Sequence, residues 1–125
     1  MLRTYGVATL IAVPLISATA LFAQTQADLT SLVGAEFRRD EVLDGVNLGG
    51  VRLQVRRGRG TVTEWSPNDR HSYDCVMTTL TCVYSRQANV TFSVEIAPDG
   101  RSATRHTVYT WQPERNHDEP LARVR

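Results

Sequence analysis

Apolar and polar residues alternate along most of the chain after residue 50, and short clusters rich in glycine, proline and asparagine interrupt the alternation. The interruptions recur roughly every nine to eleven residues, which is the spacing of short antiparallel strands joined by turns. The pattern predicts an all-β fold, an antiparallel meander of about six to eight strands that forms a small barrel or a half-open sheet. The regular strands are expected at 51–57, 60–66, 70–77, 80–86, 90–97 and 101–111.

The segments that flank these strands are less regular. Asp28 precedes apolar residues that fall on one helical face, which predicts a short N-terminal helix, although the same stretch also fits a strand at 33–38. Asp44-Gly45 and Gly49-Gly50 predict turns on either side of a short edge strand at 46–48. Residues 113–125 are polar and contain two prolines, so we expect a flexible polar tail after a β domain that spans 24–112.

The centre of the predicted sheet is a β-hairpin from His71 to Arg86, in which Cys75 faces Cys82 and Tyr73 faces Tyr84. Because side chains point alternately to the two faces of a sheet, this register decides which residues of the neighbouring strands share a face. One apolar face is expected to form the core. Its members are Val51, Leu53, Val55, Val62, Tyr73, Cys75, Met77, Leu80, Cys82, Tyr84, Val90, Phe92, Val94 and Ile96.

Turns at Gly58-Arg59, at 66–69, at 87–89 and at Gly100 set the register outside the central hairpin, and the turn at 66–69 places Glu64 opposite His71. A two-residue turn at Gly58-Arg59 would place Val55 opposite Val62. A glycine bulge at Gly100 would place Phe92 opposite His106.

The first residues of the chain have the pattern of a secretory signal peptide. Arg3 is followed by an almost unbroken apolar run, and small residues then provide cleavage sites after Ala20 or after Ala23. Residues 1–23 are therefore expected to be removed on export, with no membrane insertion of the mature protein. An uncleaved anchor is the alternative, but the run is short for a membrane span and contains Pro14 and Ser17.

Charge composition narrows the class of partner. All fourteen basic residues are arginine, which indicates a GC-rich genome and hence a bacterial export system. Loss of the leader removes Arg3 and leaves thirteen arginines and thirteen acidic residues. A neutral domain has no strong field that attracts nucleic acid, so we expect no nucleic-acid partner.

The cysteines fit an oxidising compartment. Cys75 and Cys82 are the two cysteines of the chain, and in an exported domain such a pair is expected to form a structural disulfide. The histidines do not form a paired-ligand motif, and no cofactor fingerprint is present in the sequence. We therefore expect neither a metal nor a cofactor.

The predicted register aligns Glu64, His71 and Arg86 across three neighbouring strands at one end of the core face. A carboxylate beside an imidazole can form an acid–base pair, and a nearby arginine can receive an anion. The simpler interpretation is a salt-bridged rim where the apolar face meets solvent, and it is the one favoured here.

Two other groups are candidate binding residues. Trp65, Tyr109 and Trp111 interrupt the polar outer face, so they indicate either an interface or a second small core. Arg56, Arg57 and Arg59 form a cationic hairpin tip that could hold a phosphate or an acidic polysaccharide, although such tips are more often solvated turns.

These observations predict a periplasmic or secreted, non-catalytic β-sheet binding module. Its expected partner is a protein or a small apolar ligand, bound through the aromatic residues or the barrel mouth. The first alternative is a small periplasmic hydrolase or isomerase that uses Glu64 and His71. The second alternative is a structural component of the bacterial envelope.

Overall fold

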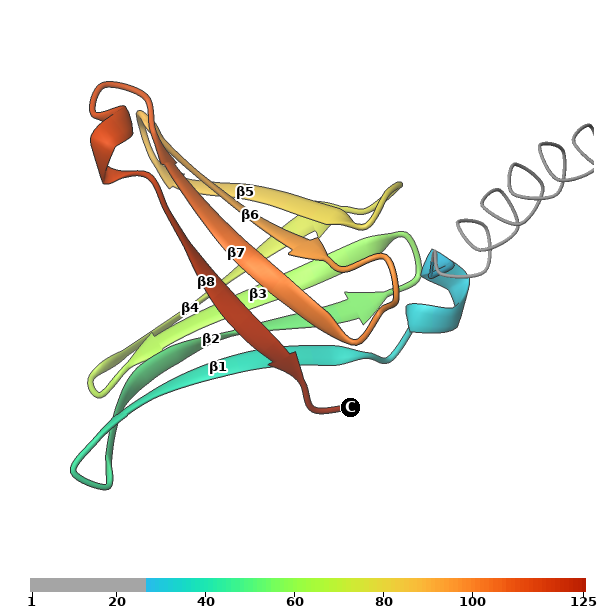
Figure 1. Cartoon of the computed structure of the whole chain (residues 1–125), viewed down its shortest axis with the longest axis horizontal. Helices are drawn as coiled ribbons and strands as arrows, with labels where there is room; N and C mark the ends of the chain where they lie inside the picture. Colours follow the sequence, from blue (N-terminus) through green and yellow to red (C-terminus); the bar gives the residue numbers. More distant parts are fainter. Residues whose placement is uncertain (1–26) are drawn as a thin grey trace, which may run out of the picture.

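The computed structural model describes residues 27–125, so the expected signal peptide at 1–23 lies outside the described residues. The described part is all-β, as predicted, and forms one nearly closed, barrel-like sheet of antiparallel strands (Figure 1). Two short 3-10 turns, η1 and η2, accompany the strands. The elements are η1 (Leu29–Leu32), β1 (Glu36–Leu43), β2 (Val46–Arg56), β3 (Arg59–Ser66), β4 (Asp69–Val76), β5 (Thr81–Gln87), β6 (Val90–Ile96), β7 (Ser102–Tyr109), η2 (Pro113–Arg115) and β8 (His117–Arg123).

The expected N-terminal helix is reduced to the single 3-10 turn η1. Asp28 caps this turn by accepting a hydrogen bond from the backbone N–H of Thr30 at 3.1 Å. Gly34 then adopts a φ of +93°, a conformation that ends the turn and redirects the chain. Phe37, expected on the helical face, instead belongs to β1 and is fully buried.

The strand order is β4-β3-β2-β1-β8-β7-β6-β5. The sheet therefore has two halves of four strands, which meet where β1 pairs with β8. This pairing is short, because only Phe37 with Arg123 and Arg38 with Ala122 face each other across it. β4 and β5 are the two edges. Figure 1 shows that the halves lie close together near η1 and the C-terminus and diverge toward the opposite end.

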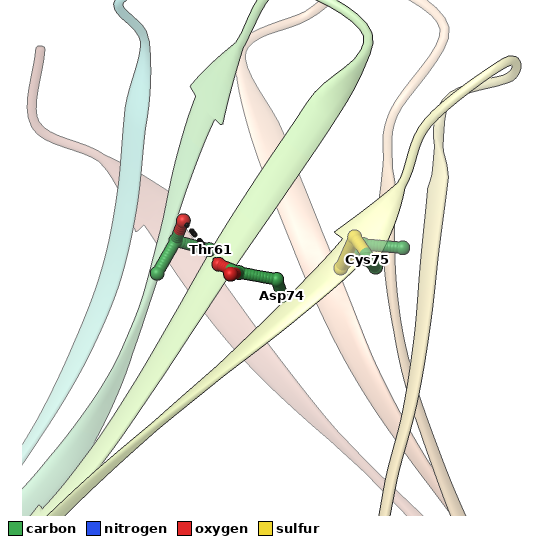
Figure 2. The surroundings of a disulfide bond; sticks show 4 residues. Thr61, Asp74 and Cys75 are labelled. Atoms are coloured by element: carbon green, nitrogen blue, oxygen red, sulfur yellow. Dashed lines mark hydrogen bonds between the residues drawn. A yellow bond between two sulfur atoms is a disulfide. The ribbon is translucent and has the colours of Figure 1, made fainter.

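The predicted hairpin at 71–86 is wrong, because β4 and β5 do not pair. The backbone N–H of Met77 donates to the carbonyl of Gly58, and the carbonyl of Leu80 accepts from Ile96. Each end of the connection is thus bonded to its own half of the sheet, and the two strands separate. Cys75 and Cys82 still form the expected disulfide, with a Cα–Cα distance of 5.6 Å. Figure 2 shows it at the end of β4, beside the Thr61–Asp74 hydrogen bond.

The predicted turn at Gly49-Gly50 is also wrong, since both glycines lie inside β2. The outward-facing indole of Trp65 on β3 covers Gly50, and a Cβ at Gly50 would lie 2.5 Å from an atom of that ring. The glycine pair therefore makes room for a tryptophan across the ladder. β2 consequently continues to Val46 and, with β1, forms a hairpin around the Asp44-Gly45 turn, as predicted for that turn.

Two register predictions need correction, with different consequences. The β2–β3 turn is centred on Arg57 and Gly58, so Val62 faces Leu53 and not Val55. A shift of two residues leaves the buried face unchanged. Between β6 and β7 the shift is one residue, and Phe92 faces Thr107 and not His106.

The one-residue shift turns β7 over, so that His106 lies on the outer face. Its imidazole contacts Asp118 at 2.6 Å and Glu95 at 3.2 Å, and the hydrogen bond with Asp118, helped by the second one, raises the pKa of His106. Arg105 therefore faces the interior, where the sequence-based register did not place it.

The expected flexible tail at 113–125 is wrong. Residues His117–Arg123 form β8, which pairs with β7 along its length and buries Leu121. The presence of Pro120 favoured the prediction of a tail, because proline lacks the backbone N–H donor that a strand uses in its ladder. β8 tolerates it because at Pro120 the strand pairs with β7 alone, the β1 pairing being confined to Ala122 and Arg123.

The core fills the part of the barrel where the halves converge. All fourteen residues of the predicted core face are buried or packed against the core. Leu32, Ala35 and Phe37 of the N-terminal segment, Ala103 of β7 and Leu121 of β8 complete the buried core. The described part of the chain contains no helix long and apolar enough to cross a membrane.

Replacement of Leu121 by alanine should destabilise the fold by about 2–5 kcal/mol, because it leaves a cavity beneath β8. Chemical denaturation of the purified protein measures this loss. Val124→Ala, at an exposed residue three positions further on, is the control and should change the stability by less than about 0.5 kcal/mol. Equal, small effects of the two substitutions would mean that the C-terminal segment is not part of the folded sheet.

Replacement of both cysteines by serine should lower the free energy of unfolding by about 2–3 kcal/mol, the chain-entropy value for so short a loop. The same denaturation experiment measures this change, with the oxidised protein as reference. An unchanged midpoint would indicate that side-chain packing alone holds β4 against β5.

A charged cleft at the open end of the barrel as candidate functional site

The side chains that face the interior change from apolar to charged toward the end where the two halves of the sheet diverge. On β1, buried Phe37 is followed two residues later by Arg39. The same alternation leads from Val62 to Glu64 on β3 and from Tyr84 to Arg86 on β5. It also places Arg105 on β7 and Glu119 on β8 inside the barrel, next to Ala103 and Leu121 in register. The open end is thus lined by ionisable groups.

Five of these side chains form an alternating chain of charges. Arg86 Nη1 lies 3.0 Å from Glu64 Oε1, and Arg105 Nη1 donates to Glu64 Oε2 at 2.7 Å. Arg105 also donates to Glu119 through Nε at 3.1 Å and through Nη2. Glu119 Oε2 lies 3.6 Å from Arg39 Nε. We call this set, Arg86–Glu64–Arg105–Glu119–Arg39, the ion-pair chain.

Arg105 is the central member and is largely buried. Burial alone would lower the pKa of its guanidinium, but the hydrogen bond to Glu119 and the neighbouring negative charges raise it above its ordinary value. Arg105 therefore stays charged inside the barrel. By binding Glu64 on β3 and Glu119 on β8, it joins the two halves of the sheet across the interior.

An aromatic stack underlies the ion-pair chain. The rings of Tyr73 and Tyr84 stack at a centroid distance of 5.4 Å, and Phe92 continues the stack at 5.4 Å from Tyr84. The Tyr84 hydroxyl donates to Glu64 Oε2 at 3.0 Å. Burial and the negative charge of Glu64 raise the pKa of Tyr84 far above its ordinary value, so this hydroxyl remains a donor at neutral pH.

A cleft of about 250 Å³ opens above these groups. Glu41, Leu48 and Trp65 contribute to its wall together with the glycines of β2. All five members of the ion-pair chain also line it. The cleft therefore combines a charged floor with a rim that is partly apolar.

The sequence-predicted trio is placed as follows. Glu64 and Arg86 are in contact, and Glu64 faces His71 directly across the β3–β4 ladder. The His71 imidazole, however, is exposed and bonds to Asp69 at 2.7 Å. The Glu64 carboxylate instead contacts two guanidinium groups and a phenol hydroxyl. The carboxylate and the imidazole thus bind different partners.

The predicted aromatic residues do not form one surface. Trp65 lies flat over Gly50 on the outer face, and the guanidinium of Arg38 stacks on its ring at 4.9 Å. Tyr109 and Trp111 line a separate hollow beside the β5–β6 turn. Trp111 is exposed, whereas Arg115 covers the Tyr109 ring at 4.4 Å.

The predicted cationic tip lies away from the ion-pair chain. Arg56, Arg57 and Arg59 surround the turn between β2 and β3 and are exposed. Arg56 and Arg57 line shallow hollows near η1, together with Val33. This is the converging end of the barrel, opposite the charged cleft.

Three members of the ion-pair chain, Arg39, Arg105 and Glu119, were missed by sequence reasoning. Glu119 lay in the segment taken for a tail, and Arg105 lay on a strand read one residue out of register. Arg39 lies just after the stretch for which a helix or a strand at 33–38 was considered. The inward position of Arg39 is nevertheless visible in the sequence, because it is two residues from Phe37.

Within residues 27–125, no three His, Cys, Asp or Glu side chains are grouped so that they could hold a metal ion. Comparisons of the chain with family models, with curated protein sequences and with solved structures find no match. The inference of function therefore depends on the geometry of the molecule.

Replacement of Glu64 by alanine should destabilise the protein by about 3–5 kcal/mol, because it leaves buried Arg105 short of an acceptor and Tyr84 without one. Thermal or urea denaturation measures the loss. The control is Glu95→Ala, whose exposed carboxylate contacts His106 on the outer face and should contribute less than about 1 kcal/mol. Comparable losses for the two variants would exclude a structural role of the ion-pair chain.

Proposed function

We propose that this protein is an exported, non-catalytic binding module that holds a protein partner at the open end of its barrel. The disulfide is compatible with an oxidising compartment. The signal-like leader and the exclusive use of arginine favour the bacterial periplasm or medium. The domain would act there by contact with another molecule.

The observation that carries the proposal is the apolar end of the β1–β2 hairpin. Around the turn, Val42 is 61% exposed, Leu43 62%, Val46 59% and Leu48 42%. We call these four residues the hairpin tip. Figure 1 shows that the hairpin projects beyond the rest of the sheet. Aliphatic side chains gathered on a projecting hairpin are unfavourable in water and are typical of an interaction surface.

The hairpin tip adjoins the charged cleft. Leu48 lines the cleft wall, and Glu41 precedes the tip and lines it as well. Apolar anchors next to charged groups that are already ordered match the composition of protein interfaces, which combine buried apolar contacts with oriented polar ones. A protein can meet both features at once.

A small apolar ligand is less well supported. The converging half of the barrel is occupied by buried side chains, among them Phe37, Leu53 and Val94. The other half is lined by the ion-pair chain, and an apolar molecule there would displace water from charged groups without replacing its hydrogen bonds. The open end thus favours a partner with polar groups.

The hydrolase or isomerase alternative also has less support. The proposed acid–base pair needs the carboxylate and the imidazole within hydrogen-bond reach of one substrate. The His71 imidazole bonds to Asp69, whereas Glu64 contacts Arg105, Tyr84 and Arg86. A structural envelope role would differ from the proposal only in the permanence of its contacts.

Replacement of Leu43 and Val46 by asparagine should reduce recovery of the partner at least about tenfold, the equivalent of 1.4 kcal/mol. These residues face each other across the hairpin, so the substitution makes both sides of the tip polar. The measurement is affinity capture from the organism's own envelope fraction, with quantitative mass spectrometry of the proteins retained.

The matched control replaces Val76 and Val83, two exposed valines of β4 and β5, by asparagine. This variant removes the same number of exposed apolar residues outside the hairpin and should retain the partner. Equal recovery by the two double variants, or a wild-type protein that retains nothing, would count against the proposed function.

A further inference from the structure

The ion-pair chain has an excess of positive charge. It begins and ends with an arginine, so that the guanidiniums of Arg39, Arg86 and Arg105 share the carboxylates of Glu64 and Glu119. The central arginine is saturated by two carboxylates. Each terminal arginine contacts one carboxylate within the described residues, so most of its donors are free to bind another group.

The terminal arginines are also the accessible ones. The side chain of Arg86 is 44% exposed and that of Arg39 is 35% exposed, whereas Glu64, Arg105 and Glu119 are largely buried. Both terminal guanidiniums line the same cleft. A ligand that enters the cleft can therefore contact two guanidinium groups without disturbing the central member of the ion-pair chain.

Arg39 shows an unmet hydrogen-bonding requirement. Its Nε is buried but has no hydrogen-bond partner among the described residues, and Glu119 lies 3.6 Å away, too far for a hydrogen bond. Leaving a buried charged donor without an acceptor is costly. At the other end of the ion-pair chain, Arg86 lies 3.0 Å from Glu64 Oε1 without hydrogen-bond geometry, so the Arg86 guanidinium makes no hydrogen bond to this oxygen. The two terminal arginines can therefore each gain from an added acceptor.

The shape and charge of the cleft indicate the class of that acceptor. A planar guanidinium binds a planar carboxylate through two parallel hydrogen bonds. Glu41 also lines the cleft and makes the lining neutral overall, with three arginines and three glutamates. The three carboxylates of the lining repel a dianion more strongly than a monoanion, so a single carboxylate is the favoured anion beside Arg39 and Arg86.

We propose that Arg39 and Arg86 bind the carboxylate of a ligand in the cleft at the open end of the barrel. The inference deepens the proposed function and rests on it, because the carboxylate would be the polar group that a partner places beside the hairpin tip. The carboxylate could belong to the end of a peptide chain or to a free organic acid, since both present the same group to the arginines.

The test is a titration of the purified, nitrogen-15-labelled protein, followed by NMR through the Nε–Hε signals of Arg39 and Arg86. The probes are acetate, N-acetylglycine, the uncharged N-acetylglycinamide and inorganic phosphate, with sodium chloride added to keep the ionic strength constant. Arg57 and Arg59, exposed on the distant β2–β3 hairpin, serve as internal controls. Acetate and N-acetylglycine should give saturable shifts at Arg39 and Arg86 and none at the controls.

The probes also distinguish the two sources of the carboxylate. Saturation at lower concentration by N-acetylglycine than by acetate supports the end of a peptide chain, and equal midpoints support a free organic acid. N-acetylglycinamide should produce no saturable shift. An equal response to the amide, or tighter binding of inorganic phosphate than of acetate, overturns the proposal of a carboxylate site.

Substitutions complete the test. Arg39→Gln should weaken binding of N-acetylglycine at least tenfold, read at Arg86, while Arg57→Gln should leave it unchanged. If Arg39→Gln alters the amide spectrum throughout the protein, Arg86→Gln, read at Arg39, replaces it. Unchanged binding in a folded variant overturns the assignment. Because this titration needs no partner protein, its outcome is independent of the hairpin-tip experiment.

Discussion

The structure depends on how two halves of a sheet are kept together when few backbone hydrogen bonds join them. On one side, β1 and β8 pair over two residue positions, and on the other β4 and β5 do not pair at all. Side-chain interactions therefore replace the missing ladder. The Cys75–Cys82 disulfide and the Tyr73–Tyr84 stack connect the edge strands, and the apolar core fills the space behind them. Toward the open end, Arg105 of β7 links the two halves by its ion pair with Glu64 of β3.

This division explains why the same strands carry both the core and the candidate site. On β1, β3, β5, β7 and β8, the inward-facing row has apolar side chains where the halves converge and charged ones where they diverge. A buried ion pair is seldom a strong stabiliser, because desolvation of the charges offsets much of their attraction. Here the ion-pair chain lies near solvent at both ends, so its desolvation is partial, and its terminal arginines remain available to a ligand.

Sequence reasoning predicted the fold class and most members of the core, because both follow from the two-residue period of a strand. An error of two residues, as at the β2–β3 turn, does not change which side chains are buried. The errors that mattered concerned features with no periodic signal. Cys75 facing Cys82 is compatible with a hairpin as well as with two strand edges, and a strand with one buried residue and a proline, as in β8, resembles a tail.

The candidate site was predicted in part for the same reason. Glu64 and Arg86 could be aligned because the turns around them were assigned with the correct parity. Arg105 could not, because Ala103 and Thr107 on one side of β7 and Thr104, His106 and Val108 on the other are similarly mixed in polarity. The apolar hairpin tip was missed because the glycine pair of β2 was read as a turn, whereas both glycines lie within the strand and Gly50 is covered by the Trp65 ring.

The unpaired edges of β4 and β5 have a consequence for behaviour at high concentration. Exposed strand edges can pair with those of another molecule and so begin aggregation. Here the disulfide keeps the two edges facing each other at the converging end, where they cannot reach a neighbour. At the diverging end, the charged side chains of Asp69, Arg70 and Arg86 lie along them. The bond that holds β4 beside β5 thereby also protects the folded protein from edge-to-edge association.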